Sequence, residues 1–111
     1  MADNPLDRLT DLSSGARRLI DYVAVLPGGA RYAVLRHIAR ISEEDTVIDL
    51  REAVDTGVLI VLPDQPNVYD FADEALRSII MDQMGPARLP RIQARANAAR
   101  RRVEGLDAYG G

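Results

Sequence analysis

The chain has 111 residues, of which 47% are apolar and 28% charged, and it contains neither Cys nor Trp. This length supports a single hydrophobic core, and the apolar fraction is too high for a disordered acidic tail. No apolar run is longer than that from Val58 to Pro63, which is far shorter than the roughly 20 residues of a membrane span. The absence of Cys excludes disulfides and thiolate metal sites, and the N-terminus lacks signal-peptide features, so we expect a cytoplasmic domain.

All 14 basic residues are Arg. Without Lys, the chain can complete neither a P-loop nor a Schiff base. The charge is also unevenly distributed. Residues 88–104 carry six Arg and one acid, a net charge of +5, whereas residues 1–87 carry eight Arg and fifteen acids, a net charge of −7. Such asymmetry is typical of a nucleic-acid-binding arm, or of a basic helix that rests on an acidic body or partner.

The first half of the chain predicts three helices. The first begins at an N-cap, Ser13 or Ser14, and ends at Pro27-Gly28-Gly29; a second, shorter helix covers about 32–40. Ser42 with its following acids starts the third, which Gly57 ends. The apolar residues expected to face the core of these three helices are Ala16, Leu19, Ile20, Val23, Ala24, Val34, Leu35, Ile38, Ile41, Val47, Leu50 and Val54.

Beyond Gly57 the pattern changes to strands. Residues 58–62 and 68–71 flank a turn-forming segment, which predicts a β-hairpin. A fourth helix over about 73–84 is expected to bury Ala75, Leu76, Ile79 and Ile80, and Gly85-Pro86 ends it. A last helix begins near Leu89, because Pro90 suits only a first turn. Its apolar residues form a narrow heptad seam that predicts one partner surface: Leu89, Ile92, Ala96, Ala99, Val103 and Leu106.

This order predicts a mainly α fold with a small β-hairpin, namely a winged helix-turn-helix followed by two C-terminal helices. The expected organisation is an N-terminal arm (1–12), a winged-helix domain (13–86), an Arg-rich C-terminal helix (87–106) and a frayed tail (107–111). In such a fold the third helix would read DNA. Here it carries six acids against Arg51 alone, and the wing tip offers Asp64, Gln65 and Asn67 without a cation. Both surfaces would repel phosphates, which disfavours specific DNA binding in this geometry.

Several segments resemble a known family. Residues 9–20 and 22–28, then 50–59, 69–71 and 75–77, and finally the Arg-rich last helix, occur in the order and spacing seen after the nucleotide-binding domain of bacterial STAND-class signal-transduction ATPases. These include LuxR-type and SARP-type transcriptional regulators. The similarity spans about residues 9–105. The resemblance implies a winged helix that serves as an internal coupling module, packed against the ATPase core and leading into helical repeats.

Two positions bear on what the resemblance implies. Some relatives have a His two residues after the Phe of the second strand, where it can approach the phosphates of a bound nucleotide. This chain has Asp73 there, and a carboxylate repels phosphate, so we do not carry a nucleotide-sensing role over. Arg77 matches the Arg of the family, although a surface or interdomain ion pair is the simpler interpretation. Pro90 departs from the uninterrupted Arg-rich run of the family.

Other candidate sites have simpler explanations. His37 has no Cys or second His with which to share a metal, so we expect it to be partly exposed or capping. The serines at 13, 14, 42 and 78 lie in no Gly-x-Ser-x-Gly turn, and the first three are better N-caps. Glu43-Glu44-Asp45 complements the helix dipole and lacks the spacing of a calcium loop. Gly28-Gly29 fits a turn between helices better than a phosphate loop.

The arginines of the last helix are the main candidate for function. Arg88, Arg95 and Arg102 are seven residues apart and share a face, with Arg91 beside them. This stripe borders an interdomain or dimer contact, is simply solvated, or holds nucleic acid nonspecifically. No aromatic residue lies between the arginines, so the stacking platform of single-strand binders is missing.

The sequence thus predicts a non-enzymatic winged-helix interaction or coupling module of a signal-transduction or transcription-regulatory protein, with no cofactor and no metal. Its expected partner is another protein or a neighbouring ATPase or helical-repeat domain, with a homodimer through the C-terminal helix as a further option. The alternative is a DNA-binding transcriptional regulator that contacts DNA through that helix. The expected interaction residues are Arg77, Arg88, Leu89, Arg91, Ile92, Arg95, Ala96, Ala99, Arg102 and Val103.

Overall fold

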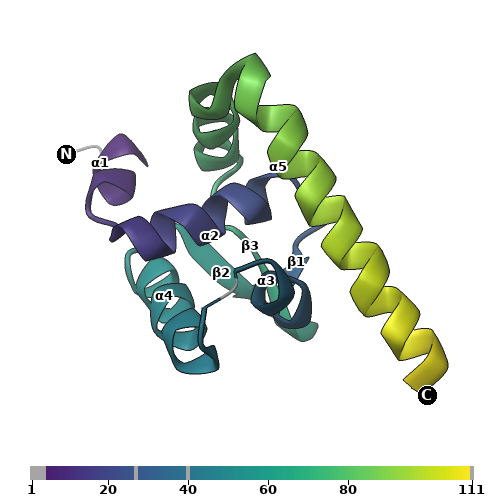
Figure 1. Cartoon of the computed structure of the whole chain (residues 1–111). Coiled ribbons are helices and arrows are strands. Elements are labelled where there is room, and N and C mark those ends of the chain that lie inside the picture. The colour runs from purple at the N-terminus through teal and green to yellow at the C-terminus, as the bar shows by residue number, and fades with distance from the viewer. Residues whose placement is uncertain (1–4, 27, 40, 111) are drawn as a thin grey trace.

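The described residues form five helices and three short strands. The computed structural model describes residues 5–26, 28–39 and 41–110, and for residues 5, 6 and 106–110 it describes only the backbone. The elements are α1 (Pro5–Thr10), α2 (Ser14–Ala24), β1 (Ala30–Arg31), α3 (Tyr32–Ala39), α4 (Glu43–Asp55), β2 (Leu59–Leu62), β3 (Gln65–Phe71) and α5 (Glu74–Gly110). Figure 1 shows α2 crossing the middle of the molecule, with the end of α5 running past it and past α3.

Local capping chemistry sets the ends of α2 and α4. The hydroxyl of Ser13 accepts from the backbone N–H of Ala16 at 3.2 Å, and that of Ser42 accepts from Asp45 at 3.0 Å. Each hydroxyl thus satisfies an amide that has no partner within the helix. The predicted N-caps are confirmed, Ser13 being the one of the two serines proposed for α2. Gly57, with φ near +81°, ends α4 as predicted.

The end of α4 is a Schellman motif that leads directly into β2. The amide of Val58 donates to the carbonyl of Ala53, and the amide of Gly57 donates to that of Val54, both at 3.0 Å. These bonds satisfy two of the last helical carbonyls, and the left-handed glycine turns the chain back onto the helix. As a result, β2 lies against α4, which fixes the relative position of these two elements.

The three strands form an antiparallel sheet in the order β1-β3-β2. The predicted hairpin is confirmed, with Val61 opposite Tyr69. The sequence did not predict β1, which pairs with β3 through Ala30 and Arg31. Gly29 (φ near +102°) precedes β1, and a Cβ there would lie 2.7 Å from Cγ1 of Val68. Only glycine permits so close an approach at this φ.

The chain turns sharply at Gly85, whose φ of 70° and ψ of 175° are not helical. Two helices therefore lie within α5, as predicted. The second begins at Pro86 rather than near Leu89, because Pro is well suited to the first helical position. Pro90 consequently lies one turn inside the helix, where it forfeits a single backbone hydrogen bond.

One hydrophobic core lies between the helices and the sheet. It is lined by α1, through Leu9, and by α2, α3, α4, the sheet and both parts of α5. Its most completely buried large side chains are Ile20, Val23, Leu26, Val34, Leu35, Leu50, Val58, Leu59, Leu76 and Ile80.

Four expectations for the elements were wrong. Residues 5–10 of the expected arm form α1, because burial of Leu9 anchors this segment on the core. The tail expected to fray after residue 106 is helical as far as Gly110. Ala75 is exposed, since Leu76, Ile80 and Met84 form the buried face of that helix. On α4, Val47 is exposed because Thr46, Leu50 and Ala53 face the core instead.

Candidate functional site

The predicted seam of the last helix packs against its own chain. Ala96, Ala99 and Val103 are buried in the core, and Leu89 and Ile92 are half-buried against it. The surface that they cover belongs to α2 and α3. The surface that the seam covers therefore lies within this molecule. Leu106, its last predicted member, lies outside the described side chains. A homodimer through the C-terminal helix stays a prediction.

Two arginines of the predicted stripe reach back to α2. The guanidinium of Arg88 pairs with the carboxylate of Asp21 at 3.4 Å, and that of Arg95 donates to the hydroxyl of Tyr22 at 3.1 Å. The basic helix thus rests partly on an acidic group of its own body. Arg91 and Arg102 are exposed.

An open groove of about 570 Å³ lies along the line where this helix meets α3. Arg95 and Arg102 line one side, and His37 and Ile38 the other. His37 is exposed, which agrees with the sequence prediction. None of the lining residues is an acid, so the groove is electrostatically suited to an anion.

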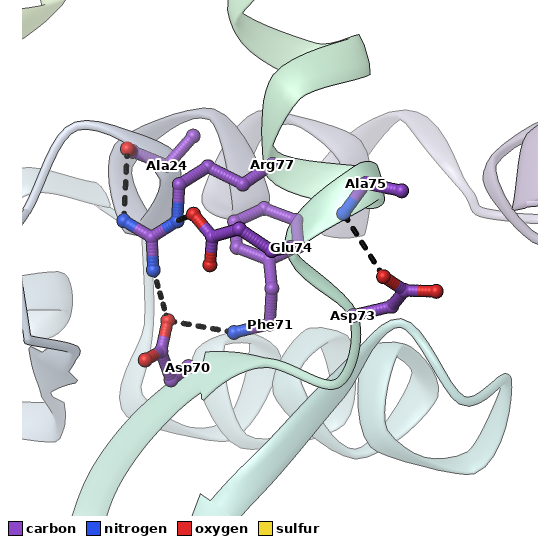
Figure 2. A network of polar contacts seen from close by, with 7 residues as sticks. All are labelled: Ala24, Asp70, Phe71, Asp73, Glu74, Ala75 and Arg77. Atoms are coloured by element: carbon purple, nitrogen blue, oxygen red, sulfur yellow. Dashed lines mark hydrogen bonds and ion pairs between the residues drawn. The ribbon is translucent and has the colours of Figure 1, made fainter.

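Arg77 is not a free surface residue but the centre of an internal network, shown in Figure 2. It pairs with Asp70 of β3 and, at 3.1 Å, with Glu74 one turn earlier. It also donates to the carbonyl of Ala24 at the end of α2, at 3.3 Å, and lies over the ring of Phe71. Its side chain is only 14% exposed. Arg77 therefore joins three elements and is held away from an external ligand.

Asp73, at the position where some of the resembling proteins have His, has a local structural role. Its carboxylate accepts from the backbone N–H of Ala75 at 2.9 Å, at the start of α5 (Figure 2). An acid in this position satisfies a helical amide and complements the helix dipole.

The sequence analysis missed a second surface, which lies on α4 and β2. Among the described residues, the large apolar side chains that are clearly exposed are Val47 and Ile48 on α4 and Ile60 and Val61 on β2. Val47 and Val61 line a shallow groove of about 280 Å³ between the helix and the sheet. The signal in the sequence was the pair Val47-Ile48, because a helix with one buried face cannot cover two adjacent apolar residues equally.

Acidic groups surround this second surface. Its helix, α4, carries six acids and one Arg, and the groove itself contains Asp55 and Arg51. On the opposite side of α4, burial together with the neighbouring Glu52 and Asp45 carboxylates raises the pKa of Asp49, although Arg18 lowers it. The acids of α4 therefore act on one another, and at Asp49 Arg18 offsets only part of that effect.

The chain matches no protein-family model, no curated protein and no solved structure. Within the described residues, no three His, Cys, Asp or Glu side chains are grouped as a metal site would require. No helix in the described part of the chain combines the length and apolar character that crossing a membrane demands.

Proposed function

We propose that this chain is a non-enzymatic, cytoplasmic winged-helix module that couples parts of a signal-transduction or transcription-regulatory protein through protein contacts. The order of elements from α2 to β3 supports the winged-helix assignment. In this order β1 lies between α2 and α3 and pairs with β3. In this arrangement α4 is the helix that would read DNA and the β2–β3 turn is the wing. The resemblance to the coupling domain of STAND-class ATPases supports the same assignment.

The observation that carries the proposal is the chemistry of α4. A DNA-reading helix must approach a closely spaced row of phosphates. With six acids against Arg51, α4 would be repelled. It exposes Val47 and Ile48 instead, and β2 beside it exposes Ile60 and Val61. Apolar side chains gathered on two adjacent elements are characteristic of protein-contact surfaces.

The second candidate is DNA binding through the last helix. It is favoured by the exposed Arg91 and Arg102 and by the groove beside α3, whose lining contains no acid. Contacts of this kind would be sequence-independent, because they would neutralise phosphates without reading base edges.

Fluorescence anisotropy separates the two candidates. A labelled random-sequence duplex is titrated with the protein at about 50 mM and about 200 mM salt, since phosphate contacts lose affinity steeply over this range. The proposal expects no binding at either concentration. Micromolar binding at low salt that collapses at high salt, and that is lost in the double variant R91A/R102A but kept in R51A, would establish the DNA-binding alternative.

A further inference from the structure

The groove between α4 and β2 is preformed by the fold. Its floor and walls come from three elements whose relative positions are fixed by the Schellman turn at Gly57 and by the pairing of Val61 with Tyr69. It measures about 280 Å³. Val47 and Val61, the large apolar side chains in it that are clearly exposed, are 41% and 40% exposed. The residues that line it are Val47, Leu50, Arg51, Val54, Asp55, Val61 and Tyr69.

The length and shape of the groove suit a helix. On α4 its lining residues recur at positions 47, 50, 51, 54 and 55, which is one helix face over about two turns. A second helix lying along α4 would present apolar anchors every three to four residues over the same distance, as in other helix-in-groove complexes.

The charges around the groove indicate which helix it accepts. Glu43 and Glu44 precede Val47 by four and three residues and so share its face, and Asp55 lies at the other end of the groove. Along α4, Arg51 is the one basic residue between them. A symmetric dimer through this groove would bring the equally acidic α4 of a second copy to the same place, and the two helices would repel each other. A helix with Arg or Lys beside its apolar residues would be attracted.

We propose that the groove between α4 and β2 docks an amphipathic, cationic helix of a partner protein or neighbouring domain. Apolar side chains of that helix fill the space between Val47, Val54 and Val61, and its basic side chains pair with Asp55 and with the acids at the start of α4. This inference rests on the proposed function, because it assigns to the coupling module its contact surface and the chemistry of its partner.

The test uses the whole chain and two synthetic 18-residue helical peptides. Both carry leucines along one face, and the other face carries arginines in the first peptide and glutamates in the second. Binding is measured by fluorescence anisotropy of the labelled peptides. We expect the arginine peptide to bind at least about tenfold more tightly than the glutamate peptide, since complementary charge selects the partner. Equal binding of the two peptides would overturn the proposal.

Substitutions locate the site. Val47→Asn and Val61→Asn add no charge, and because both residues are partly exposed we expect folded proteins that bind the arginine peptide about tenfold more weakly. Ile48→Asn is the matched control, since Ile48 is exposed on the same helix but does not line the groove; its affinity should stay within about twofold. Asp55→Arg should weaken binding by at least about fivefold. Unchanged binding in Val47→Asn and Asp55→Arg would refute the assignment.

Sedimentation velocity of the unmodified chain supplies the remaining outcome. A dimer that Val61→Asn dissociates would assign the groove to a second copy and overturn the proposal of a cationic partner. The outcome for the groove is separate from that for the proposed function. Failure of the peptide test without any DNA binding refutes the groove alone, whereas salt-dependent DNA binding through Arg91 and Arg102 refutes the coupling function.

Discussion

At the scale of single residues, Asp21 is a mostly buried carboxylate whose charge is only partly compensated by its neighbours. Its side chain on α2 is 10% exposed, and Oδ1 has no hydrogen bond. The two guanidiniums that face it are Arg17 at 3.7 Å and Arg88 at 3.4 Å, distances at which an ion pair compensates only part of the lost hydration. Burial therefore raises the pKa of Asp21 above its ordinary value, although both arginines lower it.

This imbalance predicts a defined pH dependence. Because the pKa of Asp21 is higher in the folded state than in the unfolded state, the folded state binds the proton more tightly. The contribution of Asp21 to the free energy of unfolding therefore falls as the pH rises from about 3.9, the ordinary Asp value, through the folded pKa. In Asp21→Asn this contribution is absent. The free energy of unfolding of the wild type, relative to that of Asp21→Asn, should thus increase on acidification through the same window. Urea denaturation of both proteins between about pH 7 and pH 4 measures it.

A wild-type advantage that shrinks on acidification would contradict this expectation. It would mean that Arg17 and Arg88 stabilise the carboxylate by more than burial destabilises it, and that the folded pKa is lowered instead.

At the scale of elements, Arg77 predicts how the start of α5 is held. Its guanidinium joins Asp70 of β3, Glu74 of α5 and the carbonyl of Ala24 on α2. Arg77→Ala should lower the free energy of unfolding by about 2 kcal/mol, because it leaves the half-buried Asp70 without its cation. Arg77→Lys should lower it by about half as much, since an ammonium cannot contact all three groups and stack on Phe71.

Arg91→Ala is the control for this series, because Arg91 is an exposed arginine of the same element. It should change stability by less than about 0.5 kcal/mol. Chemical denaturation of the three variants measures the differences. An Arg77→Ala protein as stable as Arg91→Ala would show that apolar packing alone holds the start of α5 against β3 and α2, and that the Arg77 network adds no stability.

The elements also show which features a sequence can predict. The caps at Ser13, Ser42 and Gly57 were predictable, because capping depends on residues within one turn of each other. The strand β1 was not, because its two residues are defined only by pairing with Val68 and Tyr69, far away in the chain. The inward face of α4 was predicted only in part: Leu50 is buried as expected, but Val47 is exposed, because this helix carries few apolar residues and buries Thr46 and Ala53 as well.

At the scale of the molecule, the two candidate surfaces differed in how far the sequence could predict them. The seam of the last helix was visible as a heptad pattern, but only the turn at Gly85 determines that it returns to α2 and α3. The groove between α4 and β2 left little trace in the sequence, because it combines Val47 and Val61 from elements whose approach is fixed by tertiary packing. Local patterns in a single sequence do not predict contacts between distant segments, because tertiary packing determines those contacts.

The intramolecular packing of the last helix leads to a final prediction. Ala96 is fully buried against the body, whereas Ala98 on the same helix is exposed. Ala96→Glu should lower the melting temperature by at least about 10 °C, because it forces a carboxylate into the core. Ala98→Glu should change it by less than about 2 °C. If the seam instead served a second chain, Ala96→Glu would reduce the mass in solution and leave the melting temperature of the released protomer unchanged. Circular dichroism melting combined with sedimentation distinguishes these cases, and a variant unaltered in both would refute the packing of Ala96 altogether.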